Sequence, residues 1–216
     1  MSTQPNPRRR LLTGLGMGAA AAGLLGWSTW LTQGIESSPP ARKNPRRFPN
    51  TRLYTHEGRE VRFYDDLIRN KLVVINMMYM QCEGICPRST RNLLQVQAML
   101  GARAGRDVFM YSITLKPEQD KHYSLKKYVE FNGIKPGWLF LTGTPEAILQ
   151  LRYRLGFYDP DPAVDGDNAT HTGMVRIGHD AYDRWTMAPS LAQPSQILST
   201  INHVDRAIVR TGLIKA

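Results

Sequence analysis

Cys82 and Cys86 are the only cysteines in this 216-residue chain, and three residues separate them. An apolar run from Leu72 to Met78 leads into the pair, and a stretch with helical periodicity follows from Ser89 to Leu100. The pattern predicts two thiols on a strand-to-helix turn, where the amides of the helix start stabilise thiolates. Two thiolates this close can form a disulfide, exchange with another disulfide or bind a soft metal.

A purely structural disulfide is the simplest alternative for two cysteines in an exported chain. A bridge across a loop of about five residues stabilises by roughly 2 kcal/mol, against roughly 3 kcal/mol for a 15-residue loop. A chain of this length buries a sizeable core and does not depend on so small a constraint. The spacing therefore favours a functional pair, but it does not separate redox chemistry from metal binding.

The N-terminus has the pattern of an export segment. Arg8, Arg9 and Arg10 precede an uncharged stretch that runs from Leu11 to Ile35. Arginines followed by a weakly apolar region indicate a twin-arginine signal or a membrane anchor. The stretch exceeds the ~20 residues of a spanning helix, and no cleavage site clearly follows it. We expect an uncleaved anchor on residues 1–35 that holds the protein at the periplasmic face of the inner membrane; cleavage would release it to the soluble periplasm.

Residues 36–52 read as a basic, poorly packed linker, because prolines and serines are followed by Arg42, Lys43, Arg46 and Arg47. Residues 53–216 have a suitable length for one domain. The chain carries a net charge of +10. No basic stripe interleaved with aromatic residues is present in the domain, so we do not expect a nucleic-acid partner.

The order of the elements predicts an α/β fold with one sheet covered on both faces. Continuous apolar runs typical of buried strands are residues 71–78 and 107–113. A further strand or turn is expected at 138–142, and helices at 89–100, 124–131 and from Pro145 to Leu155. A cysteine pair between a central strand and a helix indicates a thioredoxin-like arrangement.

Hairpins are expected at both ends of this unit. At the N-terminal end, residues 53–55 and 61–63 pair across the turn His56-Glu57-Gly58. At the C-terminal end, residues 173–177 and 184–187 pair across Gly178-His179-Asp180. A last helix is expected from about Pro194 to Arg210.

Five histidines are the remaining candidates for soft-metal ligands. His171 ends an acidic loop just before an expected strand, and such loops carry functional groups in open α/β sheets. We interpret the others, which lie in turns or on helices, as surface or packing residues: His56, His122, His179 and His203. The residues alone leave the role of His171 open.

The sequence resembles the Sco/SenC family, whose members are thioredoxin-like, membrane-tethered copper proteins that serve the assembly of cytochrome oxidase. The resemblance covers most of the chain from Leu53 onward. Its strongest parts are the Cys82-x-x-x-Cys86-Pro87 motif, Tyr128-Val129-Glu130-Phe131, Leu141-Thr142-Gly143-Thr144-Pro145-Glu146 and Thr170-His171-Thr172.

The resemblance implies that Cys82, Cys86 and His171 bind copper. Two thiolates and an imidazole suit Cu(I), and Cu(II) is a second oxidation state to expect. Copper binding requires reduced thiols, so a thiol reductant is an expected partner.

Three segments depart from the family pattern. Glu83-Gly84 stands where the family has Pro-Asp, and Thr170 stands where an Asp precedes the histidine. The family's Asp-Pro-Glu-Arg-Asp is here Lys116-Pro117-Glu118-Gln119-Asp120.

The resemblance implies a copper metallochaperone that delivers copper to, or prepares the cysteines of, the oxidase subunit carrying the binuclear copper site. A thiol–disulfide oxidoreductase is the main alternative, with Cys82 and Cys86 as nucleophile and resolving thiol and no need for His171. A third class, a peroxidase-like enzyme, also uses this fold with a reactive cysteine, but no further polar constellation argues for it.

Overall fold

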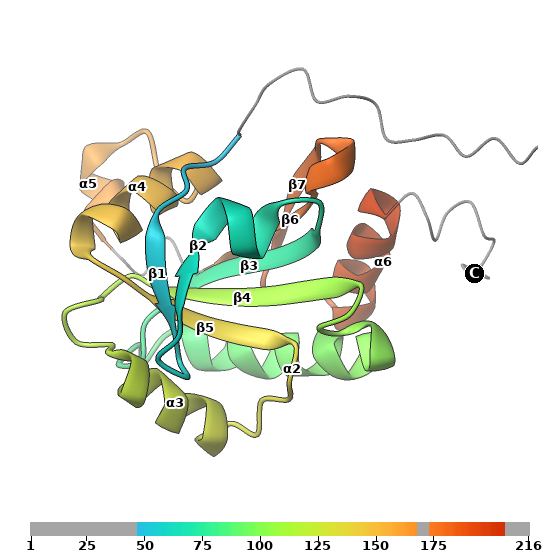
Figure 1. The fold of residues 1–216 in the computed structure, drawn as a ribbon, viewed down its shortest axis with the longest axis horizontal. Coiled ribbons are helices and arrows are strands. Elements are labelled where there is room, and N and C mark those ends of the chain that lie inside the picture. The colour runs from blue at the N-terminus through green and yellow to red at the C-terminus, as the bar shows by residue number, and fades with distance from the viewer. Residues whose placement is uncertain (1–46, 168–172, 206–216) are drawn as a thin grey trace, which may run out of the picture. The chain divides into compact units, whose positions relative to one another are not determined.

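The computed structural model describes residues 47–167 and 173–205 (Figure 1). The expected anchor on residues 1–35 lies outside the described residues, as do His171 and residues 206–210 of the expected last helix.

A seven-stranded mixed sheet forms the centre of the domain, in the order β2-β1-β5-β4-β3-β6-β7. Strands β3, β4 and β5 run parallel to one another, and every other neighbouring pair is antiparallel. The fold is α/β and thioredoxin-like, as the sequence predicted. The strands are β1 (Arg52–Thr55), β2 (Glu60–Arg62), β3 (Leu72–Met78), β4 (Val108–Thr114), β5 (Trp138–Thr142), β6 (Met174–His179) and β7 (Arg184–Pro189).

Strand β3 is buried along its whole length because it lies between β4 and β6 and is covered on both faces. Its alternate side chains enter two separate apolar clusters, with Val74 and Met78 in one and Val73 and Ile75 in the other. This is why the strand reads as an uninterrupted apolar run in the sequence.

Helices cover both faces of the sheet (Figure 1). The face with Val74 and Met78 packs against α2 (Cys86–Leu100), α3 (His122–Phe131) and α6 (Pro194–Val204). The other face packs against the π-helix η2 (Phe63–Ile68) and α4 (Pro145–Leu155). The shorter elements are η3 (Gly101–Arg103), α5 (Pro162–Asp165) and η5 (Asp180–Tyr182).

Helix α4 has the termini that its sequence indicates. The Thr144 hydroxyl accepts the Ala147 amide at the N-cap, Pro145 occupies the first turn, and Gly156 ends the helix at a φ of 83°. Helix α2 starts at Cys86, three residues before the predicted start, and this places the second cysteine in the first turn.

Both hairpins form, but the expected tip of the C-terminal hairpin is wrong. Gly178 and His179 belong to β6 and pair with Trp185 and Arg184, and the chain turns through η5 instead. The Trp185 ring lies over Gly178, where a Cβ would come within 2.0 Å of Trp185 Cε3. Gly178 therefore allows the ring to approach the strand and does not form a turn.

Residues 47–52, which the sequence interpretation assigned to the linker, are packed onto the domain. Phe48 is 2% exposed and contacts the rings of Phe63 and Trp185, with centroid distances of 6.4 and 4.6 Å. The Asn50 carboxamide oxygen accepts the amides of Tyr64 and Asp65 at 3.1 and 3.0 Å. The packed part of the chain therefore begins before Leu53.

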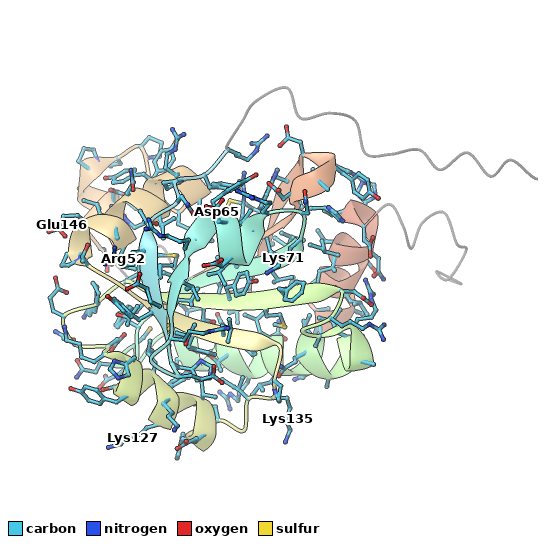
Figure 2. The ribbon with its side chains drawn as sticks, viewed as in Figure 1. Arg52, Asp65, Lys71, Lys127, Lys135 and Glu146 are labelled. Carbon is cyan, nitrogen blue, oxygen red and sulfur yellow. The ribbon has the colours of Figure 1, made fainter. Side chains whose placement is uncertain are left out.

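Charged side chains are distributed over several elements of the domain (Figure 2). Arg52 on β1 pairs with Glu60 on β2 at 3.1 Å, and the Lys71 ammonium lies 4.8 Å from the Phe109 ring centroid. Such exposed pairs contribute little to stability, which instead depends on the two apolar clusters.

The contact between Gly178 and Trp185 can be tested by substitution. Gly178→Ala should lower the free energy of unfolding by about 1–3 kcal/mol, because the new methyl overlaps the indole ring. The control Gly166→Ala places a methyl 3.4 Å from its nearest neighbour at a φ of −69°. It should leave stability unchanged or raise it by up to about 1 kcal/mol. Urea denaturation measures both, and equal values for the two variants would contradict the packing described.

Candidate metal centre

Three chain segments meet at one end of the central strands, and the cysteines lie among them. Strands β3 and β4 end together there, since Met78 pairs with Thr114. Strand β6 runs antiparallel to β3 and pairs Val175 with Asn76. The residues that lead into β6 therefore lie at the same end of the strands as the segment that carries the cysteines.

The cysteine turn runs from the end of β3 into α2. The Cys82 amide donates to the Tyr79 carbonyl at 3.3 Å, and the Ser89 amide donates to the Ile85 carbonyl at 2.8 Å in the first turn of the helix. Cys82 and Cys86 are 5% and 3% exposed, and neither is in a disulfide. The two thiols predicted to act together are thus buried on one short turn.

The surroundings of Cys82 favour its thiolate. Burial alone would raise the pKa of this thiol, but hydrogen bonds from the Cys86 thiol, the Cys86 and Gly84 amides and the Tyr79 hydroxyl outweigh it. The pKa of Cys82 is therefore below its ordinary value. Amides at a helix start are fixed donors and stabilise a sulfur anion without reorganising.

Two tyrosines border the thiols and stay protonated near neutral pH. Burial and then the hydrogen bond to Cys82 raise the pKa of Tyr79 to about 12. Burial raises the pKa of Tyr128, and the nearby thiolates add to this shift. The Tyr128 hydroxyl is also hydrogen-bonded to Thr90 on α2 at 2.9 Å.

The chain after the His171 loop is held against the cysteine turn. A Cβ at Gly173 would lie 3.6 Å from Ile85 Cδ1, next to Cys86. The Ser190 amide donates to the Gly173 carbonyl at 2.8 Å, and the Ser190 hydroxyl is 2.7 Å from that of Ser89 on α2. The residue two positions after His171 is therefore fixed beside the cysteine turn, although His171 itself is not described.

The acidic segment before this loop is anchored by a buried ion pair that sequence reasoning missed. Arg152 on α4 makes two hydrogen bonds to the Asp165 carboxylate, at 2.9 and 2.8 Å. The Tyr153 hydroxyl and the Asp159 amide donate to the same carboxylate at 2.7 and 2.9 Å. Arg152 holds the pKa of Asp165 well below its usual range.

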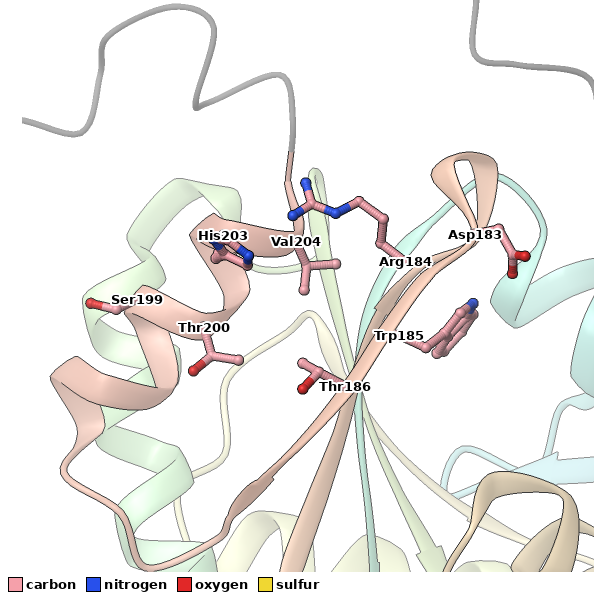
Figure 3. Close-up of a pocket in the computed structure, with 8 residues that line it drawn as sticks. All are labelled: Asp183, Arg184, Trp185, Thr186, Ser199, Thr200, His203 and Val204. Carbon is pink, nitrogen blue, oxygen red and sulfur yellow. The ribbon is translucent and has the colours of Figure 1, made fainter.

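The other four histidines lie away from the cysteines. His56 Nδ1 accepts the Phe140 amide at 3.2 Å, and burial lowers the pKa of this ring. The His122 ring meets that of Tyr123 edge-to-face, and His179 contacts Tyr182. His203 lines an open hollow of about 710 Å³ between β7 and α6 (Figure 3), with Thr186 and Thr200. None of these residues joins the thiols.

Among residues 47–167 and 173–205, no group of three or more His, Cys, Asp or Glu side chains could hold a metal ion. No helix in these residues is both long and apolar enough to cross a membrane.

A family comparison decides the relationship of this chain. The SCO1/SenC family model matches residues 42–205, which include both cysteines and the His171 loop. The chain belongs to the SCO1/SenC family. No curated protein sequence matches it significantly.

Solved structures of other Sco proteins share the fold of this SCO1/SenC chain. Bradyrhizobium japonicum ScoI with copper bound is 22% identical, with a TM-score of 0.55, covering 71% of this chain and 96% of that one. Yeast Sco1 with copper bound is 18% identical, with a TM-score of 0.57 and coverages of 74% and 93%. BsSco, described as a member of the Sco family of cytochrome c oxidase assembly proteins, is 21% identical, with a TM-score of 0.58 and coverages of 76% and 96%.

The ion pair of Arg152 and Asp165 predicts a pH dependence for the stability of this SCO1/SenC domain. Because folding lowers the pKa of Asp165 from its ordinary 3.8, its contribution is full above that pH and is lost as the pH falls toward the folded value. The difference in Tm between wild type and Asp165→Asn should therefore be largest above about pH 4 and shrink in stronger acid.

Thermal unfolding of both proteins between pH 7 and pH 2.5 measures this difference. Glu118→Gln, an exposed carboxylate on a nearby turn, is the control and should give a small difference at every pH. A pH-independent difference for Asp165→Asn would contradict the role of the ion pair.

Proposed function

We propose that this SCO1/SenC protein binds one copper ion through Cys82, Cys86 and His171 and delivers it during assembly of a respiratory cytochrome c oxidase. The recipient would be the oxidase subunit that carries the binuclear copper site. The observation that carries the proposal is a pair of buried thiols, neither in a disulfide, on the turn into α2, with the end of the His171 loop packed beside them.

The chemistry of the donor set fits copper as cargo. Two thiolates are soft ligands that suit Cu(I), and an imidazole completes a site that also accepts Cu(II). The lowered pKa of Cys82 favours the deprotonated ligand near neutral pH. Sco structures with copper bound, from yeast and Bradyrhizobium japonicum, support a copper-binding role for the family fold.

A second candidate function is reduction of a disulfide on the recipient. Two reduced thiols on one turn, one of them with a lowered pKa, favour it. The Cys82 thiolate would attack a recipient sulfur and form a mixed disulfide. The Cys86 thiolate would then attack Cys82, releasing the recipient as a dithiol and leaving a Cys82–Cys86 disulfide. A cellular thiol reductant would restore the pair.

We further infer that residues 1–35 anchor the domain at the periplasmic face of the inner membrane and that the residues after them act as a basic linker. The uncharged stretch after Arg8, Arg9 and Arg10 supports this placement. The N-terminus of the native protein, determined by mass spectrometry of the membrane and soluble fractions, tests it. A mature chain that begins after residue 20 in the soluble fraction would contradict it.

Removing either thiol tests the copper assignment. Cys82→Ala and Cys86→Ala should each lower Cu(I) affinity by more than about 100-fold, because losing a ligand costs more than the 10–100-fold of losing an outer partner. Competition with a Cu(I) chelator on the reduced protein measures the affinity, and wild type should bind one ion. Unchanged affinity in either variant would exclude this pair as the copper site.

Replacing His171 separates the two candidate functions. His171→Ala should weaken Cu(I) modestly, since two thiolates remain, and Cu(II) strongly, since imidazole suits the harder ion better. The Cys82–Cys86 reduction potential should change little, because it follows stabilisation of the thiolates at the turn. His203→Ala is the matched control, since His203 lies in the hollow between β7 and α6.

The Cu(II) visible spectrum, a redox titration and oxidase activity in cells are measured on both variants. Loss of oxidase activity with His171→Ala alone supports copper delivery. Full oxidase activity and an intact Cu(II) spectrum in His171→Ala would instead favour the disulfide-reducing function.

A further inference from the structure

The backbone of Met80 leaves the sheet without a strand partner. The last backbone hydrogen bond between the ends of β3 and β4 is donated by the Leu115 amide to the Met78 carbonyl, at 2.8 Å. Beyond this hydrogen bond β4 has ended, and the chain turns away from β3 at Pro117. The Met80 amide, two residues before Cys82, must therefore find another acceptor.

The Asp120 carboxylate supplies this acceptor. Its Oδ2 accepts the Met80 amide at 3.1 Å and the Thr114 hydroxyl at 2.6 Å. Asp120 is 2% exposed. A buried carboxylate is costly unless it is hydrogen-bonded, so the two donors and the acid hold one another in place.

The turn that carries Asp120 is itself well connected. The Gln119 and Asp120 amides donate to the Lys116 carbonyl at 3.0 and 2.9 Å. The Lys116 amide donates to the Thr114 hydroxyl at 3.0 Å, and the Lys116 ammonium lies 4.3 Å from the Tyr79 ring centroid. One turn thus holds two consecutive residues, Tyr79 and Met80, at the entrance to the cysteine turn.

We propose that Asp120 is a positioning residue for the thiol pair: its bond to the Met80 amide sets the direction in which the chain enters the cysteine turn, and thereby the geometry that the two sulfurs present to copper. The inference deepens the proposed function and rests on it for the copper measurement. Asp120 itself does not touch the metal. Loss of the bond frees the Met80 peptide and loosens Cys82 relative to Cys86 on its rigid helix.

A second buried carboxylate offers a matched control. Asp180 is also 2% exposed, and its Oδ2 accepts the Asn70 amide at 2.9 Å and the Tyr64 hydroxyl at 3.4 Å. It follows the last residue of β6, at the end of the strands opposite the cysteines. Asp120 and Asp180 thus share chemistry and burial and differ in their distance from the thiols.

The experiment compares alanine variants of the two acids in the reduced protein. Cu(I) affinity by chelator competition and the Cys82–Cys86 reduction potential are measured where circular dichroism shows each variant folded. Asp120→Ala should lower Cu(I) affinity by about 10–100-fold, the usual effect of removing an outer partner, and should shift the reduction potential. Asp180→Ala should lower the unfolding midpoint but leave both site measurements within twofold of wild type.

Two milder variants keep the proposal testable if Asp120→Ala does not fold. Asp120→Asn retains an oxygen that can accept both hydrogen bonds, so its affinity should stay within threefold of wild type. Thr114→Val removes one donor to Asp120 and the acceptor of the Lys116 amide while keeping the shape of the side chain, and should weaken Cu(I) binding less than Asp120→Ala.

Unchanged site measurements in Asp120→Ala, or equal losses in Asp120→Ala and Asp180→Ala, would overturn the proposal. An Asp120→Asn variant as weak as Asp120→Ala would also overturn it. Failure of wild type to bind Cu(I) would instead refute the proposed copper function. The reduction potential would still test positioning in that case, because it requires only the two thiols.

Discussion

The burial of β3 on both faces and along both sides is the constraint on which the rest of the structure depends. Its side chains fill two apolar clusters, and each fully buried residue of this kind contributes roughly 1.5–3 kcal/mol relative to exposure. A strand held in this way cannot shift its register by one residue without exchanging the two clusters. Apolar packing alone therefore fixes the point at which the chain leaves the sheet, after Met78.

The cysteine turn uses that fixed point. Cys86 lies in the first turn of α2, whose apolar side packs on the same cluster as Met78. Cys82 lies between the strand and the helix, where the free amides of the helix start face its sulfur. Packing thus determines where the two thiols are, and hydrogen bonds from the Cys86 thiol, the neighbouring amides and Tyr79 favour the thiolate of Cys82. The same arrangement serves a metal ligand and a nucleophile equally well, which is why the thiols alone do not distinguish the two chemistries.

Local patterns predicted the strands, α4 and the cysteine turn because each is encoded by neighbouring residues. The features that sequence reasoning missed depend on contacts between distant residues. The first amides of the π-helix η2 donate to the carboxamide oxygen of Asn50, which lies 14 and 15 residues earlier in the chain. Gly178 looked like a turn residue because the ring that covers it, Trp185, comes from the facing strand. Asp120 belongs to the segment Lys116–Asp120 that was compared with the family pattern. Its role is visible only in the structure, where β4 ends at Thr114 and leaves the Met80 amide without a strand acceptor.

The packing of Phe48 has a mechanical consequence for how the domain is held. Arg47 pairs with Asp183 at 2.9 Å, and Asp183 lies between β6 and β7 at the end of the strands opposite the cysteines. Strand β6 has six residues, so the two ends of the strand are about 20 Å apart. A pull on the chain before Arg47 would therefore act at the end of the strands opposite the cysteines. The thiols lie at the other end of the strands, about one strand length from that point of load.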